Sequence, residues 1–372
     1  MDKLPLDIMN DLADAMPYNL LGKLMEVVQD HHKEWAKVIK AHLNFRYDLR
    51  VLLSVPPELE ETENYNMLVS SRKSTFRSQG MIYKDWDRQA KKFARLSRLV
   101  LEGSPPMDYE EMLGVFVSAA PASWNMNCFK NTKMFPRDLD TVYGMLDVTA
   151  GPSKKEDYFS SDYFRPTSKF SIRCFTKYHT SILLKILHHT PKNFERVGVW
   201  HITEAPELVE SIVKHFSDSL NLKRFGIRLC GVNDDILGPF GDLFLQNKNC
   251  TSGIAGDYSI RDHNFAASAV DAFIDKWTGD NGEWNHLDTR MRLEMTEEES
   301  EKLVAGRKFV DQFLIFTEYI VPHPSKKCSL KIMFEPVRRR WGPGNGDKGV
   351  TITVVGYCRK RRHEEDNGEE GT

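Results

Sequence analysis

The sequence lacks the long apolar runs that mark membrane-crossing helices. No uninterrupted apolar stretch of about 18 or more residues occurs in the 372-residue chain. The N-terminal residues also lack the apolar segment of a secretory signal, because four acidic residues interrupt it. These are Asp2, Asp7, Asp11 and Asp14. The sequence therefore predicts a protein of the cytoplasm and/or nucleus, without a membrane partner.

Cysteine and net charge are also scarce. The 6 cysteines lie far apart, which is typical of free thiols in a reducing compartment. Lys and Arg total 51 against 53 Asp and Glu, a formal net charge of −2. This balance excludes the strong overall positive field of many nucleic-acid-binding proteins, so we expect no nucleic-acid partner.

Local signatures of catalysis and of metal binding are absent from the sequence. It has no Gly-x-Ser-x-Gly elbow, no His-Glu-x-x-His, no Walker A loop and no Cys-x-x-Cys pair. The histidine pairs His31-His32 and His188-His189 lack a further ligand at metal-binding spacing. The acidic run 297–299 follows Thr296, a pattern that predicts a helix capping box. We therefore predict no catalytic residue, no metal ion and no cofactor.

Beyond residue 66 the chain alternates short β-like runs with amphipathic helical runs. The clearest example is a strand at 197–202, a helix at 207–216 and a strand at 222–230, after which Asp234 opens another helix. We expect further strand and helix pairs at 169–175 with 178–189, 253–260 with 265–277, and 287–294 with 297–316. Their spacing of about thirty residues predicts an α/β solenoid of strand-helix repeats similar to leucine-rich repeats. A compact open sheet is the alternative, because no regular Leu-x-x-Leu-x-Leu signature occurs.

The C-terminal part differs from this alternation. Two β-like runs at 330–334 and 350–355 flank the glycine-rich segment 341–349, which predicts a hairpin with a long tip. The run Arg359-Lys360-Arg361-Arg362 is a nuclear-import signal, a nucleic-acid contact or a solvated edge. The charged residues 359–372 predict a disordered tail.

The N-terminal residues show apolar side chains at helical spacing, with Pro5 and Pro17 at places where helices begin or end. Pro56-Pro57 and the acids that follow them are typical of a connector. We therefore divide the chain into a three-helix domain, a connector, an α/β repeat-like substrate-recognition region and the tail. Their bounds are 1–50, 51–66, 67–358 and 359–372.

The order of motifs in the helical domain is the most informative feature. It opens with Leu4-Pro5, an acid and Ile8, returns to an aliphatic-proline pair at Met16-Pro17, and ends with Trp35 before Ile39. This order resembles the F-box motif. Together with the strand-helix region, it is similar to the expanded nematode set of F-box proteins with divergent regions that resemble leucine-rich repeats.

The resemblance implies a non-catalytic subunit of an SCF-type E3 ubiquitin ligase, acting in protein degradation. The F-box would bind the Skp-type adaptor of the cullin ligase complex, and the C-terminal region would bind an unknown target protein. The implied adaptor-binding residues are Leu4, Pro5, Ile8, Leu12, Pro17, Leu20, Leu21, Leu24 and Val27. Trp35 and Ile39 would hold the third helix.

Two alternatives follow from the residues alone. The helices could form the N-terminal cap of a repeat scaffold without a ligase link. The chain could instead be a hydrolase or transferase on a doubly wound sheet, with its site at the carboxyl ends of the strands. The candidate site residues of such an enzyme are His201, Asp234, Asp235, Asp257 and His263.

Overall fold

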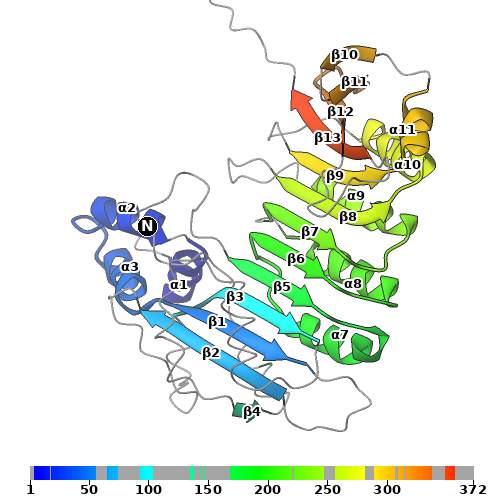
Figure 1. Cartoon of the computed structure of the whole chain (residues 1–372). Coiled ribbons are helices and arrows are strands. Elements are labelled where there is room, and N and C mark those ends of the chain that lie inside the picture. Colours follow the sequence, from blue (N-terminus) through cyan, green and yellow to red (C-terminus); the bar gives the residue numbers. More distant parts are fainter. Residues whose placement is uncertain are drawn as a thin grey trace, which may run out of the picture. The chain divides into compact units, whose positions relative to one another are not determined.

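The computed structural model in Figure 1 describes most of the α/β region and the N-terminal helices. The described residues are 4–16, 18–55, 65–73, 93–103, 135–137, 143, 146, 168–219, 222–246, 256–280, 289–305, 309–313, 316–336 and 348–356. The chain forms two compact units, Met1–Leu243 and Phe244–Thr372. The predicted tail at 359–372 lies outside the described residues. No described helix has the length and apolar character needed to cross a membrane.

Three helices open the first unit, as predicted: α1 (Leu6–Ala15), α2 (Tyr18–Val28) and α3 (Lys33–Phe45). Pro5 precedes α1, where a missing backbone N–H removes no helical hydrogen bond. The helices share a small apolar core of their own. Its buried members are Met9, Ala13, Leu21, Val28, Trp35, Val38 and Ile39.

Arg46, directly after α3, ties the end of α1 to the rest of the unit. Its guanidinium donates hydrogen bonds to the carbonyl oxygens of Met16 at 2.7 Å and Ala13 at 2.6 Å. The last carbonyls of a helix have no intrahelical partner, and a cation at this end also interacts favourably with the helix dipole. The next residue, Tyr47, already belongs to the first strand.

The first unit contains a sheet whose neighbouring strands are ordered β7-β6-β5-β3-β1-β2-β4. The strand bounds are β1 (Tyr47–Ser54), β2 (Tyr65–Lys73), β3 (Ala94–Glu102), β4 (Phe135–Arg137), β5 (Lys169–Arg173), β6 (Arg196–Trp200) and β7 (Arg224–Arg228). Strands β1, β3, β5, β6 and β7 are parallel to their neighbours in this series, whereas β2 is antiparallel to β1 and to β4. The sequence did not predict β1 to β4, and β1 includes residues expected in the connector.

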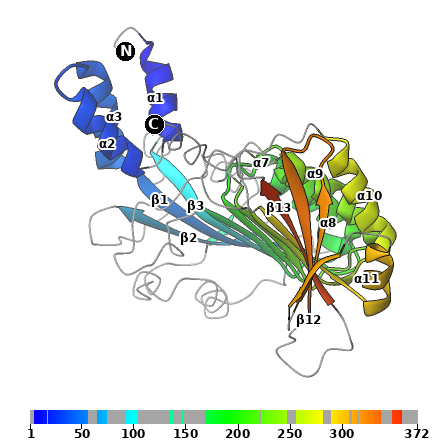
Figure 2. The same cartoon turned by 90° about the horizontal axis from the view of Figure 1, so that it is seen from above.

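Helices follow β5, β6 and β7 in the predicted alternation. The helical segments are η4 (Lys177–His179), α7 (Thr180–His189), α8 (Pro206–Phe216), η5 (Asp234–Ile236) and α9 (Leu237–Gln246). Figures 1 and 2 show α7 and α8 on the same side of β5, β6 and β7. Between these layers, buried phenylalanine rings pack in pairs 5.2 to 6.3 Å apart. The rings are Phe170, Phe194, Phe216, Phe225 and Phe240.

One backbone hydrogen bond recurs at the carboxyl ends of the parallel strands. The residue after each strand donates its N–H to the carbonyl of the last residue of the next strand. The four bonds run from Val55 to Glu102, Gly103 to Arg173, Cys174 to Trp200 and His201 to Arg228, at 2.8 to 3.1 Å. After β5, β6 and β7 the residue is left-handed, with φ of 58° at Cys174, 54° at His201 and 52° at Leu229. Successive strands therefore leave the sheet through equivalent turns.

The second unit pairs its strands in the order β10-β11-β12-β13-β9-β8. Its elements are β8 (Asp257–Asn264), α10 (Ala267–Thr278), β9 (Arg290–Met295), α11 (Glu297–Val304), β10 (Phe309–Phe313), β11 (Phe316–Pro322), β12 (Cys328–Pro336) and β13 (Lys348–Gly356). Strands β8 and β9 are parallel, and the remaining pairs are antiparallel. The predicted hairpin is confirmed, because β12 pairs with β13 and Leu330 lies opposite Val354.

The predicted helix at 297–316 is wrong beyond Val304, where α11 ends. The following apolar residues form β10, which pairs with β11. Phe309, Val310 and Phe313 favour a strand, because aromatic and β-branched side chains pack well on a pleated surface. Gly306, just past the C-cap Ala305, was the sequence signal for the helix end.

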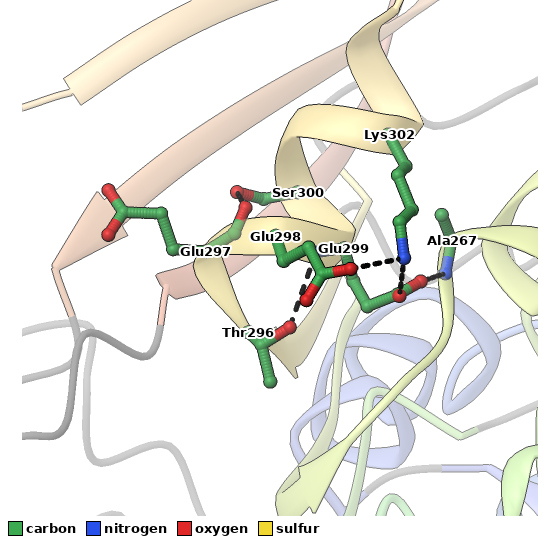
Figure 3. Close-up of polar contacts among 7 residues, drawn as sticks. All are labelled: Ala267, Thr296, Glu297, Glu298, Glu299, Ser300 and Lys302. Carbon is green, nitrogen blue, oxygen red and sulfur yellow. Dashed lines mark hydrogen bonds and ion pairs between the residues drawn. The ribbon is translucent and has the colours of Figure 1, made fainter.

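The capping box predicted at Thr296 forms in part and also serves a second helix (Figure 3). The Thr296 hydroxyl accepts the backbone N–H of Glu299 at 3.2 Å. The Glu299 carboxylate instead accepts the backbone N–H of Ala267, the first residue of α10, at 2.7 Å. Lys302 pairs with both Glu299 and Glu298. Glu299 thus joins the start of α10 to α11.

We predict that Glu299→Gln removes part of the acid sensitivity of the protein. The hydrogen bond from Ala267 and the ammonium of Lys302 lower the pKa of Glu299. A carboxyl pKa depressed by folding stabilises the fold above its unfolded value of about 4.3, and this contribution is lost as the pH falls through the folded pKa.

Urea unfolding at about pH 7 and about pH 3 brackets the unfolded value and provides the measurement. Relative to the parent chain, Glu299→Gln is expected to lose less stability on acidification. Glu298→Gln is the matched control, because Glu298 also pairs with Lys302. An unchanged acid dependence in Glu299→Gln would contradict the assignment.

Candidate functional site

Exposed apolar side chains are concentrated on the N-terminal helices. In this region the large hydrophobic residues exposed to solvent are Leu4, Leu6, Ile8, Leu12, Leu20, Val27 and Phe45. Across the remainder of the described chain, the comparable residues are Tyr178, Leu184 and Leu229. An exposed apolar surface of this kind is typical of a binding site for another macromolecule.

Helix α1 separates its core side chains from its exposed apolar ones. Ile8 and Leu12 lie four residues apart, one above the other on one side of the helix, and are 45% and 42% exposed. Met9 and Ala13 point into the small core at 1% and 0% exposure. Packing within the helical domain therefore explains Met9 and Ala13, but not Ile8 and Leu12.

Helix α2 shows the same separation. Leu20 is exposed and Val27, two helical turns later, is 68% exposed, whereas Leu21 and Val28 are buried. Leu24 lies between these groups and packs at the edge of the core. We define the exposed apolar surface as Leu4, Ile8, Leu12, Leu20 and Val27.

The residues that the F-box resemblance implied thus fall into separate groups. The exposed ones are Leu4, Pro5, Ile8, Leu12, Leu20 and Val27. Leu24 is half-buried, whereas Leu21, Trp35 and Ile39 are buried. Pro17 lies outside the described residues. The first group is available to a partner, and the buried group supports the helices from within.

Trp35 is the largest side chain of the small core. It is 3% exposed and clusters with Val38 and Ile39 of the same helix, as well as with residues of α1 and α2. Its indole nitrogen has no hydrogen-bond partner within the described residues. A buried N–H without a partner costs free energy, so apolar packing provides the stabilisation at this position.

The residues proposed for the rival enzyme lie in dissimilar settings in the two units. His201 occupies the left-handed turn after β6, and Asp235 accepts a hydrogen bond from Asn233 at 3.1 Å beside Asp234 in η5. Asp257 begins β8 and His263 lies within that strand. Because β8 extends to Asn264, the site loop expected after Ile260 is strand instead.

Neither a candidate metal site nor a reactive cysteine is evident among the described residues. There, no group of three or more His, Cys, Asp or Glu residues could hold a metal ion. Cys174, Cys230 and Cys328 are free thiols, as predicted; Cys230 and Cys328 are buried, whereas Cys174 is exposed at the turn after β5, and the other cysteines lie outside the described residues. Burial and a hydrogen bond to Glu102 raise the pKa of Cys174 to about 12. A thiol with this pKa is a poor nucleophile at neutral pH.

A second surface was missed in the sequence. On β5, β6 and β7, every second side chain points away from α7 and α8, and most of these positions are basic. We define the cationic face as Lys169, Arg173, Arg196, Arg224 and Arg228. The similarity of the three strand sequences could have revealed this face. In KFSIR, RVGVW and RFGIR, basic, apolar and small residues recur at the same positions.

Comparisons of this chain with protein-family models, curated proteins and solved structures found no significant match.

We predict that core and surface residues of the helical domain respond differently to truncation. Trp35→Ala is expected to lower the free energy of unfolding by about 3 to 5 kcal/mol, because it empties the small core. Ile8→Ala and Leu12→Ala are each expected to change it by about 0.5 kcal/mol or less, as is usual for exposed positions. Urea unfolding followed by circular dichroism measures these changes. A large loss of stability in Ile8→Ala would show that this side chain is covered within the chain.

Proposed function

We propose that this protein is the substrate-recognition subunit of an SCF-type ubiquitin ligase. Its N-terminal helices bind the Skp-type adaptor, and its strand-helix region binds a target protein destined for degradation. One observation carries the proposal: the opening F-box-like residues Leu4, Ile8 and Leu12 are exposed, whereas Trp35 and Ile39 of the same motif form the core.

This separation of exposed from buried apolar residues is typical of a module that docks onto a partner. Ile8, Leu12 and Leu20 retain about half of their apolar area in solvent, and burial against a partner would contribute about 1 kcal/mol for each of them. The buried residues Leu21, Trp35 and Ile39 hold the helices in the arrangement that presents this surface. The chain needs no cofactor for this role, because catalysis belongs to other subunits of the ligase.

We further propose that the α/β region is a solenoid similar to leucine-rich repeats. Lys169, Arg196 and Arg224 begin successive strands, which gives repeats of 27 and then 28 residues. Support comes from the chain order of the parallel strands and from the equivalent turns after β5, β6 and β7. Regular stacking of one strand-helix unit on the next has these properties.

The same strand order disfavours the rival enzyme. Doubly wound sheets bind their ligands where the strand order reverses. Strands β1, β3, β5, β6 and β7 are neighbours in chain order, so the described parallel part of the first unit has no such reversal. The scaffold alternative requires covered N-terminal helices, which fits poorly with the exposure of Ile8, Leu12 and Val27. We place the proposed ligase subunit in the cytoplasm and/or nucleus.

We predict that the full chain binds a purified Skp-type adaptor through α1. Ile8→Asp/Leu12→Asp is expected to weaken adaptor binding at least about tenfold, because two charges would enter an apolar interface. Leu6→Asp is the matched control, since Leu6 is an exposed leucine on a different side of the same helix. Biolayer interferometry with immobilised adaptor measures the affinities.

Circular dichroism and thermal unfolding establish that each variant is folded. Failure of the folded parent chain to bind the adaptor would refute the proposed function. Equal weakening by Leu6→Asp and by the double variant would refute the assignment of the exposed apolar surface. A marked loss of thermal stability in the double variant would favour the helical-cap alternative.

A further inference from the structure

The cationic face lies on the side of β5, β6 and β7 opposite the helices. Phe170, Ile172, Val197, Val199 and Ile227 point toward α7 and α8 and are buried. Side chains alternate between the faces of a strand, so the residues between and beside these lie on the other face. There the structure aligns one row of cations at the start of the strands and a second row at their ends.

The first row is purely basic. The strand register places Lys169 beside Arg196 and Arg196 beside Arg224. Neighbouring strands lie about 4.8 Å apart, and like charges at that spacing destabilise a sheet. Burial and the charge of Arg224 both lower the pKa of Arg196. The fold thus holds like charges together at a free-energy cost.

The second row combines two arginines with an aromatic ring, in the order Arg173, Trp200, Arg228. The indole of Trp200 lies against Gly198, where an added Cβ would come within 2.7 Å of the ring. The guanidinium of Arg173 stands over the same ring, 4.8 Å from its centroid. The arginine is therefore held in place by stacking.

Between the rows, the corresponding positions are small: Ser171, Gly198 and Gly226. The rows are four residues apart along each strand, or about 13 Å at the usual rise of a strand. Across three strands a row spans about 10 Å, which is the length of about three residues of an extended peptide. Ser171 and Gly198 are buried and the Trp200 indole covers Gly198, so a bound peptide would meet the two rows of charge themselves and not the strip between them.

Two described carboxylates near this face, Glu195 and Glu102, have other partners, and the charge of Glu195 also raises the pKa of Arg196. Glu195 pairs with Lys223 and accepts the backbone N–H of Ser168 at 3.2 Å. Glu102 lies beside Arg173 in the register and bonds the Cys174 thiol. Arg173, Arg196 and Arg224 form no ion pair with any described residue. Exposure along the first row rises from half-buried Lys169 and Arg196 to exposed Arg224, so a ligand can reach it.

We infer that the cationic face binds an extended acidic segment, rich in Asp and Glu, of the target protein. The inference names a ligand class for the target-binding region and so deepens the proposed function. The role of that ligand as a degradation target rests on the proposed function. Carboxylates would enter both rows, where guanidinium groups can bind them in a bidentate manner.

A nucleic acid fits this face less well. Single strands bind where bases stack on accessible aromatic rings along a positive groove. Trp200 is the one aromatic side chain among the described residues of these two rows, and it already stacks with Arg173. The arrangement offers cations for carboxylates but no accessible ring for a base.

The test uses the full chain and a fluorescein-labelled peptide of alternating Glu and Ser, with a Gln and Ser peptide as the neutral control. Fluorescence anisotropy is expected to detect the Glu peptide alone, and its binding should weaken as salt rises, because ions screen exposed charges. Arg196→Gln/Arg224→Gln is expected to weaken binding about tenfold. Lys185→Gln/Lys214→Gln, which removes two exposed cations from α7 and α8, should bind as the parent does.

If the double variant does not fold, Arg224→Gln alone serves as the second test. Its binding to the Glu peptide is expected to be about threefold weaker. Equal binding of Glu and Gln peptides, or no effect of Arg224→Gln, would overturn the inference. A thymidine oligonucleotide that bound more tightly than the Glu peptide, with loss in Arg224→Gln, would also overturn it.

Adaptor binding measured on the same preparations separates the two proposals. A parent chain that binds adaptor but not the Glu peptide contradicts this inference alone. Peptide binding without adaptor binding supports the acidic-ligand assignment and contradicts the proposed function.

Discussion

The parallel register of β5, β6 and β7 determines both faces of this part of the molecule. Once the strands align Lys169 with Arg196 and Arg224, the alternation of side chains along each strand places basic and apolar residues on opposite faces. Apolar residues meet α7 and α8 on one face, and basic residues gather on the other. A shift of one residue in any strand would place charges beneath the helices and phenylalanines in solvent. The hydrophobic core therefore holds the cationic rows in register.

The helical domain also places its buried and its exposed apolar side chains on different sides of the same element, here a helix. On α1, one turn separates Ile8 from Leu12, while Met9 and Ala13 point into the core. The core is small, so its stability depends on a few side chains such as Trp35, and the exposed apolar residues outside it contribute little to that stability. Arg46 then couples these helices to the sheet, because it binds the end of α1 and directly precedes β1.

Much of the fold could be predicted from periodicity. The three helices, strands β5, β6 and β7 with their helices, and the β12–β13 hairpin all follow from apolar spacing and turn residues. Strand β3 was missed because the buried Arg95, Ser97, Arg98 and Glu102 interrupt it, so neither a continuous apolar run nor a regular alternation marks it. The helix at 297–316 was extended too far because apolar residues alone do not distinguish α11 from β10.

The candidate sites were predictable to different degrees. The F-box-like order located the apolar side chains, but could not tell exposed Ile8 from buried Leu21, because that depends on how the helices pack. The cationic face was missed because the whole-chain charge of −2 averages over a local excess. Arg196 and Arg224 are 28 positions apart in the sequence and become neighbours only through the strand register.

The recurring bond after β1, β3, β5 and β6 has a consequence for how such a protein changes over time. It joins backbone to backbone, so the exposed side chains of Cys174 and His201 take no part in it. Substitutions at these two positions can therefore accumulate while the strands stay paired. The ends of β5 and β6 thus present side chains that can change without disturbing the pairing of the sheet.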